Sequence, residues 1–353
     1  MNARYARHIS LSEVGTQGQQ KLAEAKVLVV GAGGLGCAVL QYLTAAGVGT
    51  LGIVDFDMIS LSNLQRQVLY SEKEVGKKKV DCAKARLQAL NSDVEIITHD
   101  TDFNVSNAET LCSSYDIIVD ASDNFVTRYC INDACIRLGK PMVFGSLYKF
   151  QGQVSVFNYH EGPSYRCLFP KPPQPGEVPN CNEIGVLGVL PGLIGTLQAT
   201  EVLKMILGLG DVLSGTLLQY DTRTHTQYLW NISKQPEEIE KVKNRAKIVP
   251  VQTQDCILTP TLSLQEISSE EAILWIDVRE AHELPKIEAQ NVIRDSEVDL
   301  SEAKTKGKKL VFFCQSGVRS RKATDEYMAK GVSNCYSLQE GAAALQQWLA
   351  EKT

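Results

Sequence analysis

Short apolar runs and longer mixed segments alternate along the first part of the chain. The run over 27–30 is rich in β-branched residues, which is typical of a strand covered on both faces. Glycines spaced G-x-G-G-x-G follow it, and residues 37–46 then have the composition of a helix. The next apolar run, 51–54, predicts a second strand. Strand, glycine turn, helix and strand in this order are typical of an open α/β sheet.

The same alternation continues along the chain. The expected elements are a helix ending at Leu90, a strand near 94–98, a helix near 104–113, a strand over 115–120, a helix through Gly139 and strands over 142–145 and 152–159. Residues 1–25 are expected to be helical and polar, and 184–207 to form a buried helix or a subunit interface. The fold class predicted for this part is α/β, a Rossmann-like nucleotide-binding domain with a mixed sheet.

The apolar pattern is lost over 230–251 and returns in a second, smaller α/β unit. The intervening segment is rich in Lys and Glu, which is typical of a linker. Strands are expected over 272–280 and 309–314. We therefore predict a first domain over 1–231, a linker over 232–255 and a second domain over 256–353.

The glycine turn has the spacing of a nucleotide-binding site. Glycines let the backbone approach a phosphate, and the helix behind them presents N–H groups and a favourable dipole. Asp55 ends the second strand, 24 residues after Gly31, where a carboxylate can hold a ribose hydroxyl. A tight structural turn is the alternative. The candidate binding residues here are Gly31, Gly33, Gly34, Gly36 and Asp55.

Polar and basic side chains follow Asp55 at close spacing. Arg66 offers fork-shaped donors and Lys79 a compact charge, and both suit a triphosphate better than hydride transfer. The alternative for the lysines of 77–79 is a solvated helix start. Asp123 follows a predicted strand, at the sheet edge where ligands bind, and its alternative role is that of a helix cap.

Composition narrows the function classes. The chain has 353 residues, of which 44% are hydrophobic and 22% charged, as in ordinary globular proteins. The net charge of −5 argues against nucleic acid or anionic membranes as main partners. The first twenty residues lack an apolar core, so no secretory signal is expected. Because no export signal is visible, we expect the ten cysteines to be reduced thiols in the cytoplasm. They include no C-x-x-C pair, so we expect no structural zinc.

Two cysteines are candidates for chemistry. Cys181 lies in a polar, proline-rich stretch, and exposure there favours reactivity, whereas the alternative is a small buried hydrophobe. Cys314 ends a predicted strand and opens a loop before a helix. Backbone N–H groups of such a loop, the helix N-terminus and a nearby arginine favour the thiolate and can hold an added sulfur atom. The loop consists of Cys314, Gln315, Ser316, Gly317, Val318 and Arg319.

Residues 1 to about 230 resemble the MoeB/ThiF family of ubiquitin-activating-enzyme-like adenylyltransferases. The matching motifs are the glycine turn, Asp55-Phe56-Asp57, Ser62-Asn63-Leu64-Gln65-Arg66-Gln67, Val75-Gly76 with Lys79, and Asp120-Ala121-Ser122-Asp123-Asn124. The resemblance implies that ATP binds to the glycine turn and to Asp55, Asp57, Ser62, Asn63, Arg66, Lys79, Asp123 and Asn124. It also implies that Asp123 holds Mg through ATP.

Further roles come from the same resemblance. Arg7 matches the arginine that reaches the phosphates of the other subunit in a homodimer, although its charge alone is typical of a solvated surface. Cys181 matches the cysteine of the family's crossover loop. The implied catalytic residues of this region are therefore Arg7, Arg66 and Cys181.

Residues from about 256 to 353 resemble a rhodanese, a smaller α/β domain in which Cys314 to Arg319 would be the active-site loop. The Gly-His-Ile stretch expected of a rhodanese is replaced here by residues 284–289. The first region also departs from its family, whose members usually hold zinc with two C-x-x-C pairs. Cys167 has no such partner and 230–239 contains no cysteine, so we predict no zinc.

The function implied is ATP-dependent adenylation of the C-terminal glycine of a ubiquitin-like sulfur carrier that ends in Gly-Gly. A persulfide on Cys314 would then give a thiocarboxylate for molybdopterin or thiamine biosynthesis, with a cysteine desulfurase or thiosulfate as sulfur donor. Two alternatives stay open. One is a non-catalytic scaffold that binds the carrier. The other is a nicotinamide-dependent dehydrogenase, which does not explain Arg66, Lys79 and Asp123 together.

Overall fold

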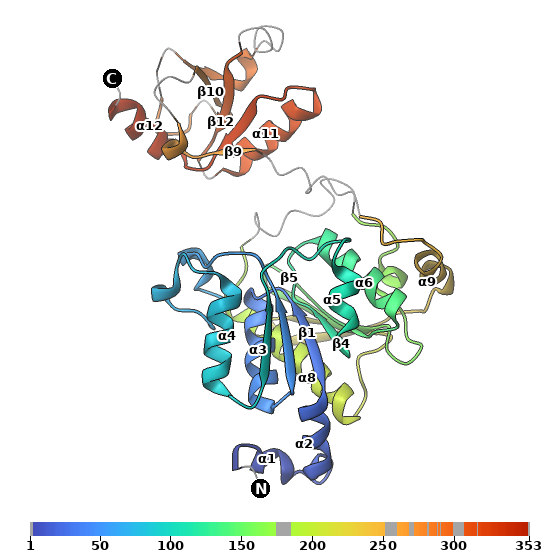
Figure 1. Ribbon diagram of the computed structural model, residues 1–353. Coiled ribbons are helices and arrows are strands. Elements are labelled where there is room, and N and C mark those ends of the chain that lie inside the picture. Colours follow the sequence, from blue (N-terminus) through green and yellow to red (C-terminus); the bar gives the residue numbers. More distant parts are fainter. Residues whose placement is uncertain are drawn as a thin grey trace. The chain divides into compact units, whose positions relative to one another are not determined.

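The computed structural model divides the chain into two compact units, Met1–Thr253 and Gln254–Thr353. In Figure 1 the first unit runs from blue to gold, and the second is orange and red. The residues that the structure describes are 3–173, 185–250, 260–267, 272–280, 282–287, 289, 291–298, 307–315 and 317–351.

The first unit is built on an eight-stranded sheet with the order β3-β2-β1-β4-β5-β6-β7-β8. The pairs from β3 to β5 are parallel and those from β5 to β8 are antiparallel, so the predicted mixed sheet is confirmed. The strand order reverses between β1 and β4. The strands are β1 (Lys26–Val30), β2 (Thr50–Val54), β3 (Glu95–His99), β4 (Ile117–Asp120), β5 (Met142–Tyr148), β6 (Gln151–Phe157), β7 (Thr216–Asp221) and β8 (Thr226–Asn231).

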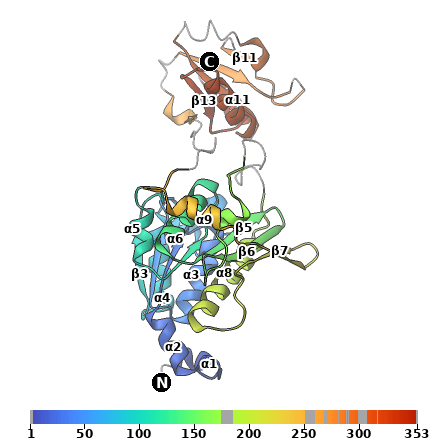
Figure 2. The ribbon, with the colours of Figure 1, turned by 90° about the vertical axis from the view of Figure 1, so that its right-hand side faces the viewer.

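Helices cover both faces of this sheet (Figures 1 and 2). Val27 and Val29 of β1 pack with α2, α3, α4 and α8, whereas Leu28 and Val30 pack with α5 and α6. Successive side chains of a strand point to opposite faces, which explains why β1 is apolar from Val27 to Val30. The helices are α1 (Ala6–Ile9), α2 (Gly15–Glu24), α3 (Gly34–Ala46), α4 (Lys79–Leu90), α5 (Ala108–Ser113), α6 (Phe125–Leu138), α7 (Tyr165–Leu168), α8 (Val189–Leu207) and α9 (Pro236–Lys243).

Among the described residues, α8 is long and apolar enough to cross a membrane, judged by length and composition alone. In this fold it lies along α3 and against β5 and β6. Leu190, Ile194 and Val202 are fully buried there. These contacts are those of a core helix. Of the two predictions for 184–207, they agree with the buried helix.

The structure differs from the linker predicted for 232–255. Helix α9 lies within that range, with proline at its start, glutamates in its first turn and lysines in its last. Ile239 and Val242 are buried against Ile136 and Cys167. The charges lie on the exposed side of a short amphipathic helix, whose two buried positions are too few for a periodic signal. This part of the predicted linker belongs to the first unit.

The second unit has a parallel five-stranded sheet with the order β11-β10-β12-β13-β9. Trp275 and Phe313 pack on the side of α12, and Ile276 and Phe312 on the side of α11. This smaller α/β unit was predicted. Its elements are β9 (Thr261–Leu262), β10 (Ile273–Asp277), β11 (Val292–Arg294), β12 (Lys309–Phe313), α11 (Val318–Ala329), β13 (Cys335–Leu338) and α12 (Ala342–Glu351).

A buried carboxylate ties three segments of the first unit together. Asp133 on α6 has a side chain only 1% exposed, and it accepts hydrogen bonds from Arg166 on α7 at 2.6 and 2.9 Å. Arg245, just after α9, lies 3.4 Å from the same carboxylate and accepts a hydrogen bond from Arg137 through its carbonyl oxygen. Helix α6, helix α7 and the stretch after α9 are therefore fixed to one another.

We predict that Asp133→Ala lowers the free energy of unfolding of the first unit by about 3–5 kcal/mol, because the buried Arg166 guanidinium loses its carboxylate. Urea titration of the full chain measures the change. Glu240→Ala removes the exposed partner of Lys243 and should cost less than about 1 kcal/mol. Equal effects of the two substitutions would contradict the role given to Asp133.

Candidate active sites

A cavity of about 1420 Å³ opens at the carboxyl ends of β1, β2 and β4. The strand order reverses at this point, and open α/β sheets bind ligands there. The volume exceeds the roughly 300–1,000 Å³ of an ordinary small-molecule site, so there is room for more than a nucleotide. The predicted binding residues in its wall are Gly31, Gly33, Gly34, Asp55, Asp57, Arg66, Lys79, Asp123 and Asn124.

Backbone contacts at two glycines of the turn leave no space for a side chain. Gly31 has a φ of +102°, and a Cβ there would lie 2.6 Å from the carbonyl oxygen of Ala121. A Cβ on Gly36 would lie 2.0 Å from the carbonyl oxygen of Gly31. Gly33 is the N-cap of α3, and an added Cβ would come no nearer than 3.6 Å to Gln67. The N-terminus of α3 thus borders the cavity, where its N–H groups can bind an anion.

Asp55 is held against this turn. Its carboxylate accepts the N–H groups of Ala32 and Asp57, each at 2.8 Å. Burial raises the pKa of Asp55, and the nearby Lys79 ammonium and these two N–H groups oppose the rise. The carboxylate is therefore rigidly placed at the end of β2, where a ribose contact was predicted.

Lys79, the first residue of α4, is only 4% exposed. Its Nζ lies 2.7 Å from Oδ2 of Asp57, whose side chain is half exposed. A buried ammonium needs a counter-charge, and Asp57 supplies one. Both residues line the cavity, so an incoming phosphate would meet a lysine that is already in position.

Arg66, Asp123 and Asn124 occupy the rest of the wall. Arg66 donates to the carbonyl oxygen of Ser62 at 3.2 Å, and Asp123 is exposed. Asn124 also caps α6, because its Oδ1 accepts the N–H of Thr127 at 2.8 Å. The cap that was an alternative for Asp123 is thus supplied by the next residue.

Several predicted residues lie elsewhere. Ser62, Asn63 and Gly36 are not among the residues of the wall. Asn63 instead accepts the backbone N–H of Ser60 at 3.2 Å and so closes a local turn. Arg7 is exposed on α1 and is not in the cavity wall of its own chain.

The predicted residue Cys181 lies in 174–184, outside the described residues. Its role as crossover-loop cysteine stays a prediction.

Sequence reasoning missed a buried ion pair whose arginine lines the cavity. Arg128 on α6 donates to Asp120 at 2.8 Å, and its guanidinium lies 4.9 Å from the centre of the Phe144 ring. This pair fixes the start of α6 against the end of β4 and so positions Asp123. An aspartate at a strand end with an arginine eight residues later was the available signal.

Gln67 is a second residue that was not predicted as a binding residue. It is 4% exposed, lines the cavity, and its Oε1 has no hydrogen-bond partner among the described residues. Buried polar atoms rarely lack a hydrogen-bond partner, so Gln67 is a candidate for contact with a ligand in the cavity.

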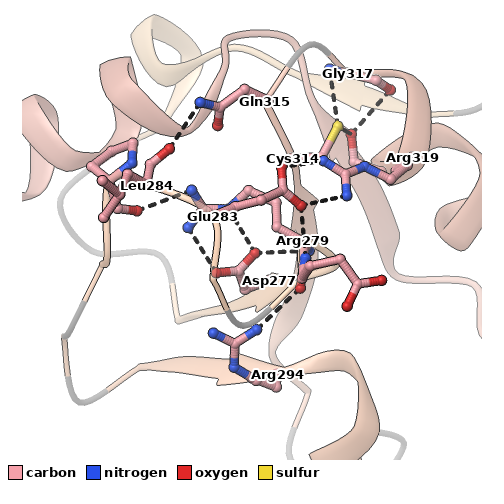
Figure 3. A network of polar contacts seen from close by, with 12 residues as sticks. Asp277, Arg279, Glu283, Leu284, Arg294, Cys314, Gln315, Gly317 and Arg319 are labelled. Atoms are coloured by element: carbon pink, nitrogen blue, oxygen red, sulfur yellow. Dashed lines mark hydrogen bonds and ion pairs between the residues drawn. The ribbon is translucent and has the colours of Figure 1, made fainter.

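The second site surrounds Cys314 at the end of β12 (Figure 3). The thiol is 1% exposed, and its sulfur accepts the N–H of Gly317 at 3.1 Å. Gly317 has a φ of +84°, and its carbonyl oxygen accepts the hydroxyl of Ser320 at 3.0 Å. A backbone donor is thus directed at the sulfur. Ser316 lies outside the described residues, and Val318 begins α11.

A buried ion pair holds the segment 283–285, which contacts this loop. Arg279 and Asp277 form two hydrogen bonds of 2.8 Å and are both buried. Arg279 also donates to the carbonyl oxygen of Pro285 at 2.9 Å. Sequence reasoning missed a further partner: the guanidinium of Arg319 binds both carboxylate oxygens of Glu283, each at 2.6 Å.

The other described cysteines are buried in the two cores. Burial raises the pKa of Cys37 and Cys130 to about 12 and that of Cys335 to about 11. Such thiols behave as small hydrophobes rather than as nucleophiles.

Cys167, where a zinc ligand was considered, lies among protein donors. Its sulfur accepts the N–H of Gln235 at 3.2 Å and the N–H of Ser164 at 3.3 Å. The side chain of Gln235 donates to the carbonyl oxygen of Cys167 at 2.9 Å. Within the described ranges, no cluster of three or more His, Cys, Asp or Glu could hold a metal ion.

The first unit combines a Rossmann-like sheet with a cavity at a glycine turn, which defines a nucleotide-binding protein. The second unit adds a parallel sheet with a cysteine loop. Residues 5–241 match the model of the ThiF family, and residues 261–348 match that of the rhodanese-like domain. The chain belongs to the ThiF family and carries a rhodanese-like domain.

Curated relatives resemble the chain to different extents. It is 38% identical, over 97% of its length and 92% of the relative's, to "Probable adenylyltransferase/sulfurtransferase MoeZ" of Mycobacterium tuberculosis. It is 54% identical, over 62% of its length and 82% of the relative's, to "Sulfur carrier protein adenylyltransferase" of Thermus thermophilus. "Adenylyltransferase and sulfurtransferase MOCS3" of Culex quinquefasciatus is 56% identical over 62% of this chain, and the match spans half of the mosquito protein.

Solved structures agree with the fold of the first unit. E. coli MccB, solved with MccA-N7isoASN, superimposes with a TM-score of 0.60 at 23% identity. The match covers 67% of this chain and 74% of MccB.

We predict that purified protein contains well under one zinc per chain. The reason is that the Cys167 sulfur lies among N–H donors of Ser164 and Gln235, and no second cysteine is near in sequence to complete a ligand pair. Elemental analysis by mass spectrometry measures the content. Stoichiometric zinc that persists after dialysis against a chelator would refute the prediction.

Proposed function

We propose that this protein adenylates the C-terminal glycine of a ubiquitin-like sulfur carrier with ATP, and that sulfur carried on Cys314 then converts the adenylate to a thiocarboxylate. The observation that carries the proposal is the presence of both sites in one chain, which over 97% of its length is similar to a relative named for both activities. The thiocarboxylate would serve molybdopterin or thiamine biosynthesis.

The volume and the lining of the cavity support ATP and a peptide tail as joint occupants. One end is formed by the glycine turn and Asp55, which suit phosphates and a ribose. The other end is lined by the β5–β6 hairpin, including Ser146, Tyr148 and Gln153. A chain that ends in Gly-Gly has no side chains at its end, so its backbone can come close to the α-phosphate.

The residues of the wall also fit a magnesium ion bound through ATP. Asp123 is an exposed carboxylate at the sheet edge, and carboxylate oxygen is a ligand that Mg²⁺ prefers. When bound, the ion would neutralise charge on the phosphates. The family membership supports ATP use, and Asp123 as the residue that holds Mg is our proposal.

In the first step, a carboxylate oxygen of the carrier attacks the α-phosphorus of ATP, and pyrophosphate leaves. Lys79 and Arg66 stabilise negative charge that develops on the phosphates. Asp55 orients the ribose, and N–H groups of the glycine turn hold the phosphates. The product is an acyl-adenylate. In it the carboxylate, a poor electrophile, has become a reactive mixed anhydride.

In the second step, the outer sulfur of a Cys314 persulfide attacks the acyl carbon, and AMP leaves. The carrier is then joined to Cys314 by an acyl disulfide. Attack of the Cys181 thiolate on the Cys314 sulfur would release the thiocarboxylate and leave a disulfide between the two cysteines. A cellular dithiol would reduce that disulfide and complete the cycle.

We further propose a homodimer in the cytoplasm, in which Arg7 of one subunit contacts phosphates in the site of the other. The position of Arg7, exposed and outside the cavity wall of its own chain, supports action across an interface. The eight described cysteines are all thiols, which supports a reducing compartment. A cysteine desulfurase or thiosulfate would supply the sulfur.

We predict that Arg66→Ala and Asp123→Ala each slow ATP–pyrophosphate exchange by about 100-fold or more, which is roughly 3 kcal/mol of transition-state stabilisation. The reason is that Arg66→Ala removes a positive charge at the phosphates, whereas Asp123→Ala removes the carboxylate that would hold the Mg bound through ATP. Exchange with the carrier present is the measurement, and Arg86→Ala, an exposed arginine paired with Glu74, is the control. Parental rates in both variants would refute the site. ATP binding by the parent chain without any exchange would instead support a carrier-binding scaffold.

The same assay tests the dimer. A mixture of Arg7→Ala chains and Arg66→Ala chains should regain part of the exchange that each variant lacks, because one site of a mixed dimer has both arginines. If Arg7 acts within its own chain, no mixed dimer has a complete site and the mixture stays inactive.

We predict that the two cysteines separate the two steps. Cys314→Ala should leave pyrophosphate exchange at the parental rate and abolish thiocarboxylate formation, because adenylation needs no thiol. Cys181→Ala should also spare exchange and should slow release of the thiocarboxylate. Mass spectrometry after treatment with a sulfur donor should find the added sulfur, about 32 Da, on Cys314. Sulfur found on Cys181 alone would show that the rhodanese-like domain does not hold the sulfur that is transferred.

A further inference from the structure

Both exposed side chains that the structure describes in the Cys314 loop are bound by one neighbouring segment. Gln315 donates to the carbonyl oxygen of Leu284 at 2.9 Å. The two terminal nitrogens of Arg319 bind the two carboxylate oxygens of Glu283, each at 2.6 Å (Figure 3). Glu283 and Leu284 therefore occupy the polar groups of Gln315 and Arg319 at the exposed edge of the loop, which we call its rim.

Glu283 is itself held in place. Its carboxylate accepts the N–H of Glu280 at 2.8 Å, and the hydrogen bonds from Arg319 lower its pKa to about 2. The segment is fixed further along by the hydrogen bond from Arg279 to the carbonyl oxygen of Pro285. The carboxylate is thus ionised at any physiological pH and oriented by contacts on both sides.

This arrangement changes the charge that an incoming sulfur donor meets. The Cys314 thiol is buried, so a donor comes to it past the rim of the loop. The charge of Arg319 is matched by that of Glu283, and both of its terminal nitrogens are occupied. Thiosulfate carries two negative charges and would have to displace Glu283 or approach it. A thiol persulfide carries at most one charge on its sulfurs and needs no cation.

We propose that Glu283 is a specificity-determining residue, which selects thiol persulfides over thiosulfate as sulfur donors for Cys314. The inference rests on the proposed sulfur transfer and names its donor class. The Cys314 thiolate attacks the outer sulfur of a donor R–S–SH, the donor S–S bond breaks, and R–S⁻ leaves. Cys314 retains the outer sulfur and its proton as a persulfide, and no external oxidant or reductant is used. With thiosulfate, the group that leaves is sulfite.

The test compares two donors on the full chain. Cysteine persulfide and thiosulfate are each added to the protein, and the rate at which Cys314 gains about 32 Da is followed by mass spectrometry. The readout is the ratio of the thiosulfate rate to the persulfide rate, because a merely structural defect would lower both rates. Glu283→Gln should raise this ratio about tenfold, since it removes one negative charge from the path of a dianion.

Three further variants test whether a change in the ratio is due to the charge of Glu283. Glu283→Asp keeps the charge and should keep the parental ratio. Arg319→Gln leaves the carboxylate without its partner and should lower the ratio, so the proposal can be tested even if Glu283→Gln does not fold. Glu326→Gln makes the same change of charge at an exposed position of α11 and should leave the ratio unchanged.

The outcomes separate the inference from the function on which it rests. An unchanged ratio in Glu283→Gln, or a higher ratio in Arg319→Gln, would overturn the role of Glu283 while leaving sulfur transfer in place. If neither donor adds sulfur to Cys314 in the parent chain, the proposed sulfur transfer fails and the inference fails with it.

Discussion

Gly31 and Ala121 approach each other so closely that a single added methyl group would lie 2.6 Å from a carbonyl oxygen. This contact joins the turn after β1 to the turn after β4, the two strands between which the sheet order reverses. A second close approach follows from it, because Gly36 packs onto the carbonyl of Gly31 and so sets where α3 begins. A third lies behind it, where a Cβ on Gly195 of α8 would lie 2.4 Å from the carbonyl oxygen of Leu35. The cavity, the N-terminus of α3 and the core helix α8 are therefore placed by one series of backbone contacts.

Residues whose role depends on local sequence could be predicted. The strand β1, the glycine turn and Asp55 lie within about one βαβ unit, where apolar runs and turn residues determine the order of elements. Their positions around the cavity follow because parallel strands bring their carboxyl ends to one edge. The loop of Cys314 was predictable for the same reason, since strand, cysteine, glycine and helix are consecutive.

Residues whose role depends on packing between distant segments could not be predicted. Glu283 and Arg319 are 36 positions apart, and nothing in either neighbourhood indicates their contact. Asn63 lies in a matching motif, yet its side chain closes a local turn, because a short amide competes for nearby backbone N–H groups. The edge strand β8 has mostly exposed residues and therefore no alternation of apolar and polar positions from which to infer it.

The low reactivity of the core cysteines has a consequence for the proposed sulfur transfer. Burial raises the pKa of Cys37 and Cys130 to about 12, so these thiols are almost entirely protonated at neutral pH. Exchange of sulfur between thiols requires the thiolate, so these side chains would not react with the persulfide and the disulfide proposed for Cys314. Burial of these core thiols would thus restrict the proposed sulfur exchange to cysteines that can ionise, and would prevent unwanted disulfides in the two cores.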